Sequence, residues 1–322
     1  MNAVTVSVII PAFNSRRWIR EALDSALNQT SVPIEVIVVD DGSTDGTSDV
    51  LAEYGSRIIV LSQPNAGVSA ARNRGMRAAR GDVIAFLDAD DVWHPRKLEL
   101  QMRVLVDQPE ISVLGTRAVA WPARESTAAV DDPVPTVVRF GSDELAIKNR
   151  LTVSSVVVRR SVVEAIGEFD TTLQGAEDHD YWLRAAEAAG AANLDLPLTG
   201  YRSVEGSVSK RPAAMEADMR RILRKLDDRG WGDRCLLRRK AYGYCSYSCA
   251  FMYGAAGCRT KAITSLARSM LTYPLPFRRS EVSMAMARPR LMVVLALRSL
   301  RLLPDAAEEK VTFSAAPMGV RT

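Results

Sequence analysis

Short apolar runs rich in β-branched residues alternate with helical patterns over the first 121 residues. The runs predict strands at 4–11, 35–41, 57–62, 82–87 and 111–120. Between them, apolar side chains recur at helical spacing in 18–27, 45–53, 67–79 and 95–106. Strands that alternate with helices are typical of βαβ units, so we expect an α/β fold with a mostly parallel sheet flanked by helices. Such strands are expected to be buried on both faces.

The pattern changes twice farther along the chain. Residues 122–135 are rich in Pro, Ala, Ser and Asp, which predicts a flexible surface loop or a lid. A second strand-and-helix region follows, with extended segments at 153–159 and 191–203 and a helix at 177–189. After Pro212 only helical patterns remain, at 213–229, 235–253, 260–271 and 289–303. We therefore predict one domain over 1–212 and a helical C-terminal region over 213–322.

The composition is that of a folded, globular chain. Of the 322 residues 47% are apolar and 25% are charged, which excludes a disordered or collagen-like protein. The apolar stretches are shorter than the roughly 18 residues that a membrane-spanning helix needs. The first residues resemble a strand more than a signal peptide, and the four cysteines lack the spacing of a zinc site or a disulfide framework. We therefore expect a cytoplasmic protein.

Charge is distributed unevenly between the two predicted parts. Residues 1–212 contain 22 Lys and Arg against 29 Asp and Glu, whereas residues 213–322 contain 20 against 9. The basic part is expected to contact an acceptor, a membrane surface or another copy of the chain. Within it, residues 288–303 combine an apolar body with basic flanks. That pattern predicts either peripheral attachment to the anionic inner face of the cell membrane or a bundle helix with a solvated basic face, and both alternatives are open.

Acidic residues gather where two of the predicted strands end. The first cluster runs from Asp40 to Asp45, and Asp41 is the residue that we expect to contact a ligand, because its acceptors suit ribose hydroxyls or the N–H groups of a base. Asp40 and Asp45 are as well explained as caps of a turn or helix. In an open α/β sheet, ligands bind at the carboxyl ends of the strands.

The second cluster contains Asp88, Asp90 and Asp91, again directly after a buried strand. Crowded carboxylates repel one another unless a cation or hydrogen-bond donors offset their charge. Oxygen ligands of this kind suit Mn²⁺ or Mg²⁺ shared with substrate phosphates. The alternative is a solvated acidic turn that caps the following helix.

Four motifs in order make the pattern specific. They read SVIIPAFN at 7–14, DDGSTD at 40–45, NAGVSAARNRG at 65–75 and FLDADD at 86–91. Together they closely resemble the family 2 glycosyltransferases of the GT-A fold, a Rossmann-like sheet with an Asp-x-Asp (DXD) motif. The resemblance continues through GEFD at 167–170 and EDHDYWL at 177–183, and it covers about residues 4–210.

The resemblance implies roles for matching positions in this sequence. The donor would be bound by Pro11, Phe13, Asp41, Arg72 and Asp88. Asp90, together with Asp88, would hold a divalent metal under the diphosphate. Arg72 is also placed to pair with Asp88 or with phosphate.

The second acidic pair would serve the acceptor. An acceptor hydroxyl is a poor nucleophile, so a carboxylate must take its proton, and the resemblance assigns this role of general base to Asp178. Glu177 and Trp182 are acceptor candidates, but both have structural alternatives: Glu177 would cap the helix or orient a neighbour, and core packing is the favoured explanation for Trp182. Asp180 is expected to pair with Arg184.

The resemblance thus implies an inverting glycosyltransferase that uses a nucleotide-sugar donor, UDP-linked, and a glycan or lipid-linked acceptor of cell-surface polysaccharide biosynthesis. Relatives often carry a His after the late Tyr-Arg pair, whereas here Tyr201 and Arg202 lead to Ser203 and Val204, which leaves the metal to Asp90, diphosphate and water. A catalytically inactive, membrane-associated scaffold is one alternative. A sugar-phosphate nucleotidyltransferase is another, but it needs a Gly-rich basic loop after the first strand. No nucleic-acid partner is expected, because no reading module accompanies the basic charge.

Overall fold

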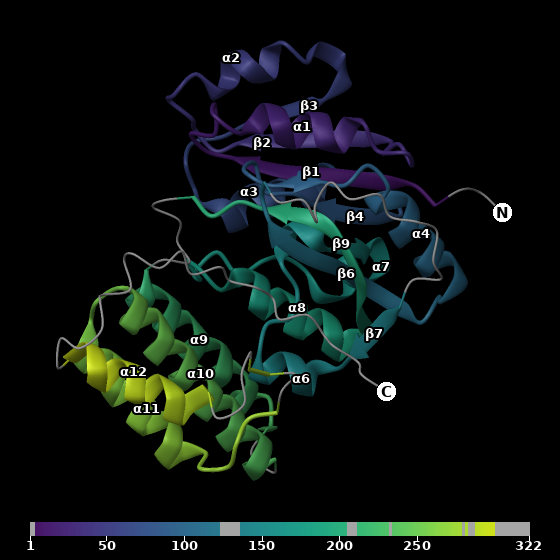
Figure 1. The fold of residues 1–322 in the computed structure, drawn as a ribbon. Helices are drawn as coiled ribbons and strands as arrows, with labels where there is room; N and C mark the ends of the chain where they lie inside the picture. The colour runs from purple at the N-terminus through teal and green to yellow at the C-terminus, as the bar shows by residue number, and fades with distance from the viewer. Residues whose placement is uncertain are drawn as a thin grey trace. The chain divides into compact units, whose positions relative to one another are not determined.

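The computed structural model describes residues 4–122, 136–204, 211–231, 234–278, 281–282 and 287–299. The chain divides into two compact units (Figure 1). The first, which we call the sheet unit, gathers 1–142, 150–173 and 177–204. The second, the helical unit, gathers 143–149, 174–176 and 205–322. All of the candidate site residues named above belong to the sheet unit.

Within the described residues, nine strands form one sheet in the order β3-β2-β1-β4-β8-β6-β9-β5, with β7 paired to β9. The strands are β1 Val6–Ala12, β2 Glu35–Asp40, β3 Ile59–Ser62, β4 Val83–Phe86, β5 Val92–Trp93, β6 Ile111–Ala120, β7 Val137–Phe140, β8 Val157–Arg159 and β9 Gly190–Tyr201. The pairs among β1 to β4 and the pair β6–β9 are parallel, while β8 lies antiparallel between β4 and β6. The predicted α/β architecture with a mostly parallel sheet is confirmed.

The register of the central strands brings their carboxyl ends to one edge. Ala12 of β1 pairs with Asp40 of β2, and Ile9 of β1 pairs with Phe86 of β4. Residues that follow these strands therefore emerge side by side, although the sequence separates them by dozens of positions. This edge is where the predicted ligand-binding residues lie.

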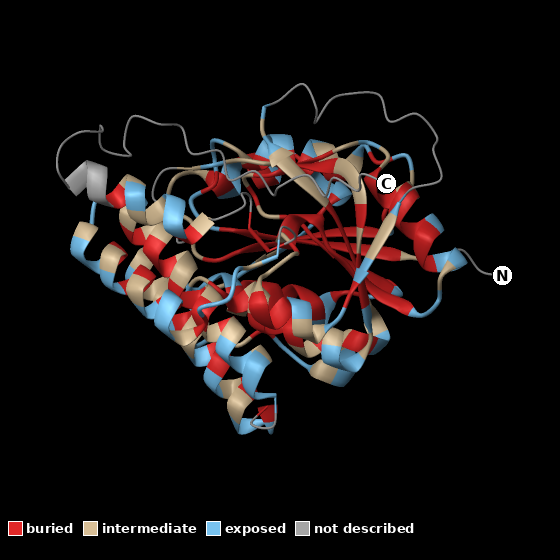
Figure 2. Ribbon diagram, turned by 60° about the horizontal axis from the view of Figure 1, so that its bottom comes forward, coloured by how far each residue is buried: buried red, intermediate tan, exposed pale blue. Residues whose placement is uncertain are grey.

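Helices cover the sheet unit on both faces. They are α1 Ile19–Leu27, α2 Thr47–Ala52, α3 Val68–Ala78, α4 Lys97–Asp107, α7 Arg160–Ile166 and α8 Glu177–Ala188, with short 3-10 turns η1 Gly55–Arg57 and η2 Val153–Ser155. In α1, Ile19, Ala22, Leu23 and Ala26 are buried at helical spacing, which produces one apolar face. Figure 2 shows the strands buried between these layers.

Two of the predicted strands depart from the expected burial: β3, and the end of β6, where 117–119 are half-buried and Ala120 is exposed. β1, β2 and β4 are buried at every position, but Ile59 and Val60 of β3 are exposed. β3 forms the end of the sheet and pairs only with β2, so the prediction that every strand is buried on both faces is wrong for 57–62. Residues 123–135 of the predicted loop lie outside the described residues.

The helical unit contains α6 Ser142–Ile147, α9 Pro212–Asp228, α10 Cys235–Ala255, α11 Arg259–Thr272 and α12 Ala287–Ser299. α10 and α11 pack closely because Gly243 leaves room for Tyr273, and the hydroxyl of Ser269 donates to the carbonyl of Gly243 at 2.6 Å. Among the described residues, no helix has both the length and the apolar character needed to cross a bilayer.

α12 carries the described part of the basic segment 288–303. Arg288 is buried, and its guanidinium donates to the carbonyl oxygens of Tyr273 and Leu275 after the end of α11. Leu295 is buried and lies 3.2 Å from the position that a Cβ would take on Gly254. The helix therefore packs within the bundle, as the second alternative predicted, and Arg288 does not face an external surface. Residues 300–303 lie outside the described residues.

Candidate active site

The turn between β4 and β5, residues 88–91, is built around a buried carboxylate; we call it the acidic turn. Asp91 is only 1% exposed and accepts hydrogen bonds from the Ser154 hydroxyl at 2.5 Å and from the backbone N–H of Arg202 at 2.9 Å. The same Ser154 hydroxyl accepts a bond from the N–H of Asp88 at 3.1 Å. Burial, reinforced by the charges of Asp90 and Asp88, raises the pKa of Asp91 well above its usual range. Asp91 thus fixes the turn from inside.

Asp88 and Asp90, the other two carboxylates of this turn, are half-buried. Burial, with the charge of Asp88 as the second cause, raises the pKa of Asp90 to about 6. A raised pKa means that the charged form is disfavoured until a cation or donor offsets it, so this pair fits an oxygen-ligated divalent ion. Among the described residues, no three His, Cys, Asp or Glu side chains gather into a ready metal cage. Any metal here would complete its shell with substrate oxygens and water.

The side chain of Arg202 bonds the backbone of the acidic turn. Its Nε donates to the backbone carbonyl of Asp90 at 2.9 Å and its Nη2 to Glu21 at 2.8 Å. The guanidinium carbon lies 4.2 Å from the centre of the Trp18 ring. The turn is therefore tied to α1 and to the end of β9, two elements far apart in sequence.

Arg72, on α3, connects the acidic turn to α8. Its Nη2 lies 2.8 Å from Oδ1 of Asp88 and its Nη1 lies 2.7 Å from Oε1 of Glu177. The side chain is 3% exposed, and its guanidinium carbon lies 5.5 Å from the centre of the Phe169 ring. Burial alone would lower the pKa of Arg72, but the charges of Asp88 and Glu177 outweigh it and raise the pKa. The predicted pairing of Arg72 with Asp88 is confirmed, and its Nη atoms engage protein carboxylates.

The second acidic pair opens α8. Glu177 is buried and holds Arg72, so the alternative that it orients a neighbour is confirmed. Asp178, next along the helix, is half-buried, and its Oδ1 accepts the N–H of His179 at 2.7 Å. Asp180 pairs with Arg184 at 3.0 Å, as predicted. The candidate base is thus one residue from a buried link to the acidic turn.

Trp182 belongs to the core. It is 0% exposed, and its ring lies against those of Phe86, Phe169 and Tyr181 at centroid distances of 6.0, 6.2 and 5.4 Å. A ring that is fully buried cannot present a face to a sugar, so the suggestion that Trp182 is an acceptor platform is wrong and the core alternative holds.

Asp41 shapes the loop before α3. It is 3% exposed and accepts hydrogen bonds from the side chain of Gln63 at 2.7 Å and from the N–H groups of Ala66 at 2.9 Å and Gly67 at 2.8 Å. Gly67 has φ 91°, a conformation that favours glycine. Both carboxylate oxygens of Asp41 thus accept hydrogen bonds from this loop. A ligand that contacts Asp41 would have to share these oxygens with the loop.

The neighbouring aspartates of the first cluster are structural caps. Asp40 accepts the N–H of Ser43 at 3.0 Å, and Asp45 accepts both the N–H and the hydroxyl of Thr47 at the start of α2, at 2.9 and 2.5 Å. The capping alternative is therefore confirmed for both residues. Neither carboxylate is needed to explain a ligand site.

Phe13 presents an apolar surface at the same edge. It follows β1 and is 50% exposed, whereas Pro11 is buried within the strand. Asn14, with φ 49°, accepts the N–H of Thr44 at 2.8 Å and so joins the loops after β1 and β2. The residue after Phe13 is thus tied to the loop that follows β2, and the Phe13 ring is half exposed to solvent.

The sequence interpretation missed two residues that build this site, Ser154 and Arg202. Ser154 lies in the turn η2, 63 positions after Asp91, within an apolar stretch that carries no recognisable signal. In the sequence, Arg202 carries no signal beyond the absence of a following His. Both residues bond Asp91, from which they are far apart in sequence, so the contacts exist only in the folded sheet.

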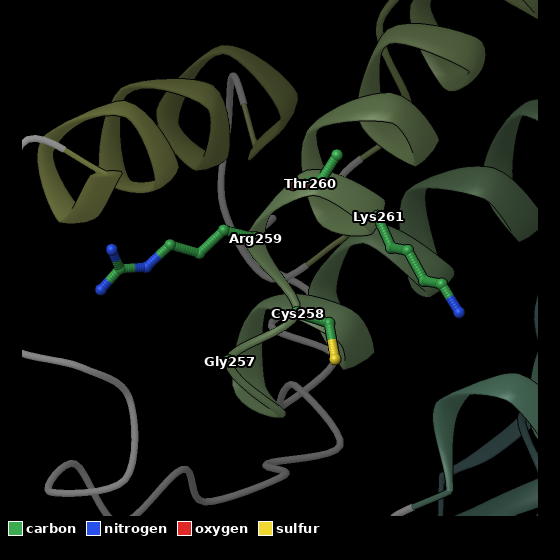
Figure 3. A pocket seen from close by; sticks show the side chains of 5 residues that line it. All are labelled: Gly257, Cys258, Arg259, Thr260 and Lys261. Atoms are coloured by element: carbon green, nitrogen blue, oxygen red, sulfur yellow. The ribbon is translucent and has the colours of Figure 1, made fainter.

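A shallow hollow lies in the helical unit. It measures about 520 Å³ and is lined by five consecutive residues, Gly257 to Lys261, at the start of α11 (Figure 3). The side chains of Arg259 and Lys261 point away from each other (Figure 3). It therefore lacks the converging polar groups of a binding site.

Comparison with known proteins bears on the sheet unit. Residues 7–145 match the family model described as glycosyl transferase family 2. An uncharacterised glycosyltransferase of Rickettsia prowazekii, RP339, is 32% identical over 188 residues, which span 56% of this chain and 58% of that protein. TuaG of Bacillus subtilis, a glycosyltransferase named for teichuronic acid biosynthesis, is 42% identical over 107 residues, 32% of this chain and 42% of TuaG. Each match thus spans less than two thirds of the relative's own length.

Solved structures share the fold at low sequence identity. The mannosyltransferase PcManGT of Pyrobaculum calidifontis, in complex with GDP-Man and Mn²⁺, gives a TM-score of 0.57 at 18% identity, covering 93% of this chain and 81% of that one. S. aureus TarS 1-349 in complex with UDP-GlcNAc gives 0.53 at 19% identity, covering 86% and 90%. The expected GT-A fold with a helical C-terminal region is confirmed.

Proposed function

Because residues 7–145 match the family model of glycosyl transferase family 2, we propose that this chain transfers a sugar from a nucleotide-sugar donor, UDP-linked, to a hydroxyl of a glycan or lipid-linked acceptor. The observation that carries the proposal is the buried link from Asp88 through Arg72 to Glu177, which joins the acidic turn to the acidic pair Glu177 and Asp178 at the start of α8. The relative named for teichuronic acid biosynthesis supports an acceptor from cell-surface polysaccharide biosynthesis. Residues 1–212 would carry catalysis.

Asp178 is the proposed general base. As the acceptor oxygen attacks the anomeric carbon, the new carbon–oxygen bond forms, the bond to the donor phosphate breaks, and Asp178 takes the acceptor proton. The leaving nucleoside diphosphate carries away the electron pair of the broken bond. A single displacement of this kind inverts the anomeric configuration.

Asp90 and the oxygen of Asp88 that Arg72 does not contact would hold a divalent ion, Mn²⁺ or Mg²⁺, which supplies positive charge to the leaving diphosphate. Arg72 keeps Asp88 oriented, and Glu177 keeps Arg72 in place. The mannosyltransferase that shares this fold was solved with Mn²⁺, which supports the assignment.

The donor's base would lie between Phe13 and the loop that Asp41 fixes. An exposed ring beside a rigid backbone loop suits a flat, polar base. The two structural neighbours contain UDP-GlcNAc and GDP-Man, which supports a nucleotide-sugar donor. Our choice of uridine rests on the motifs at 7–14 and 40–45.

Two other functions fit less well. An inactive scaffold would not need the intact set of Asp88, Asp90 and Asp178. A sugar-phosphate nucleotidyltransferase needs a basic, Gly-rich loop where this chain has Phe13 and Asn14. We also propose that the protein works in the cytoplasm at the inner face of the membrane, where lipid-linked acceptors are found.

Thermal unfolding with UDP, GDP, dTDP and CDP, each with and without Mn²⁺, tests the proposal. Ligand at about 100 times its dissociation constant stabilises a protein by roughly 2.7 kcal/mol, which shifts the midpoint by several degrees. We expect a shift with UDP that needs Mn²⁺ and that disappears in Asp90→Ala. The absence of a shift with every nucleotide would contradict the proposed donor site.

A further inference from the structure

Exposed leucines of the helical unit gather at one corner. Leu236 begins α10 and is 63% exposed, Leu271 lies in the last turn of α11 at 81%, and Leu275 follows at 52%. Arg239, one turn after Leu236, donates from Nε to the carbonyl of Thr272 at 2.9 Å. The start of α10 and the end of α11 are therefore held together, with the three leucines close to this contact. We call these three residues the leucine corner.

The backbone of the leucine corner is held in place by contacts of the residues between and beside the leucines. Tyr273, between Leu271 and Leu275, is 7% exposed and stacks on Phe277 at 5.6 Å between ring centres. The guanidinium of Arg288 donates to the carbonyls of Tyr273 and Leu275. The backbone is thus fixed while the side chains of Leu271 and Leu275 stay in solvent.

The stretch around the corner is basic. Residues 234–278 contain eight Lys and Arg and no Asp or Glu. Four of these charges are offset by carboxylates from outside the stretch, since Arg238 pairs with Asp227, Lys240 with Glu281, Arg234 with Asp143 and Arg268 with Glu216. Arg239 bonds a carbonyl, which leaves its charge uncompensated, and Arg278 is exposed. Exposed leucines among uncompensated cations are complementary to an anionic lipid surface, whose headgroups take the charge and whose acyl chains take the leucines.

We propose that the leucine corner docks on an anionic bilayer, with Leu271 and Leu275 below the headgroups and Arg239 and Arg278 among them. This places the membrane contact on α10 and α11 instead of on the segment 288–303, of which Arg288 is buried. The inference deepens the proposed function, since it brings the enzyme to a membrane-borne acceptor, but the binding itself does not depend on catalysis.

Flotation of the full chain with vesicles tests the proposal. Vesicles of phosphatidylcholine alone are compared with vesicles that also contain phosphatidylglycerol, at low and high salt. We expect flotation only with phosphatidylglycerol, weakened by salt because charges are screened. Leu271→Ser and Leu275→Ser should each weaken binding about tenfold, the loss expected for a partly inserted leucine. Arg278→Glu should weaken it as well.

Val106→Ser, which changes an exposed apolar side chain of α4 at 57%, is the matched control and should bind like the parent. Thermal shift with nucleotide, measured on every variant, separates loss of membrane binding from failure of the donor site. Protein that stays at the bottom with phosphatidylglycerol vesicles overturns the proposal. So does parent-like flotation of Leu271→Ser and Leu275→Ser, or a sedimentation experiment in which these variants dissociate a dimer, because the corner would then cover a second copy.

Discussion

Arg72 and Glu177 are 105 positions apart in the chain, yet Nη1 of the arginine lies 2.7 Å from Oε1 of the glutamate, and both side chains are buried. The same guanidinium holds Asp88 of the acidic turn. One side chain therefore holds both the acidic turn and the first turn of α8, where Asp178 lies. This link gives the candidate site a structure that can be tested residue by residue.

Replacing Asp178 should separate binding from transfer. Asp178→Asn keeps the shape of the side chain but removes its ability to take a proton, so we expect the transfer rate to fall by about 10²- to 10⁴-fold. Nucleotide binding, measured by thermal shift with Mn²⁺, should stay unchanged. Asp180→Asn, on the same helix turn, is the control, because its partner is Arg184. Transfer at the parent rate by Asp178→Asn would show that the base lies elsewhere.

Removing Arg72 from its buried link with Asp88 and Glu177 should lower the free energy of unfolding. Arg72→Met leaves Asp88 and Glu177 without their shared cation, and removing one partner of a buried ion pair typically costs about 3–5 kcal/mol. Unfolding in urea measures this loss. The control is Arg20→Met, which removes an exposed pair with Glu53 and should cost less than about 1 kcal/mol.

A lysine substitution at position 72 distinguishes the effect of the positive charge from the effect of bonding both carboxylates at once. Arg72→Lys keeps the charge but cannot reach both carboxylates at once. We therefore expect kcat to fall by a larger factor than the KM for the donor rises, with a shifted pH–rate profile, because the first turn of α8 loses its fixed orientation. An unchanged kcat and pH profile in this variant would mean that the link serves stability alone.

Ser154→Ala should loosen the acidic turn. The change removes the donor to the buried Asp91 and the acceptor for the N–H of Asp88, and an unsatisfied buried group costs about 1–3 kcal/mol. Mn²⁺-dependent nucleotide binding should weaken in parallel. Ser155→Ala is a matched control, since Ser155 is equally buried but its hydroxyl bonds only the carbonyl of Thr152 in its own turn. Equal effects of the two substitutions on nucleotide binding would contradict the special role of Ser154.

Lys97 should make stability depend on alkaline pH. It is 0% exposed, with Nζ 2.8 Å from Oε1 of Gln101 and 4.0 Å from the centre of the Trp93 ring, and burial lowers its pKa well below the usual value. Between that lowered pKa and about 10.4, the unfolded chain binds the extra proton, so the free energy of unfolding rises with pH.

Lys97→Met removes this dependence. We expect the variant to gain stability relative to the parent at neutral pH and the gain to shrink by up to about 1.4 kcal/mol per pH unit toward pH 10. Urea unfolding at a series of pH values measures it, with exposed Lys261→Met as the control. Parallel pH curves for parent and Lys97→Met would contradict the prediction.

Much of the fold could be predicted from local pattern. The strands and helices over 4–120 follow the alternation of apolar runs because each apolar run must be buried, and the acidic clusters lie where strands end. The sequence pattern predicts neither β5, which has only two residues, nor β7, which follows directly on the Pro-rich segment 122–135. The exposure of β3 was missed since a sequence does not say which strand lies at the end of the sheet.

The sequence by itself determined the class of the fold, the strand-end carboxylates and the motifs of the family, since these depend on neighbours within a few residues. Only the tertiary structure decided what each carboxylate does: Asp91 is enclosed by Ser154 and Arg202, Asp41 holds a loop, and Asp88 and Glu177 share Arg72. Trp182 likewise became core only where α8 packs on β4. The physical reason is that a side chain's partners are set by the closure of the sheet, which brings together segments far apart in the chain, such as Asp91 and Arg202, 111 positions apart, and Glu21 and Arg202, 181 positions apart.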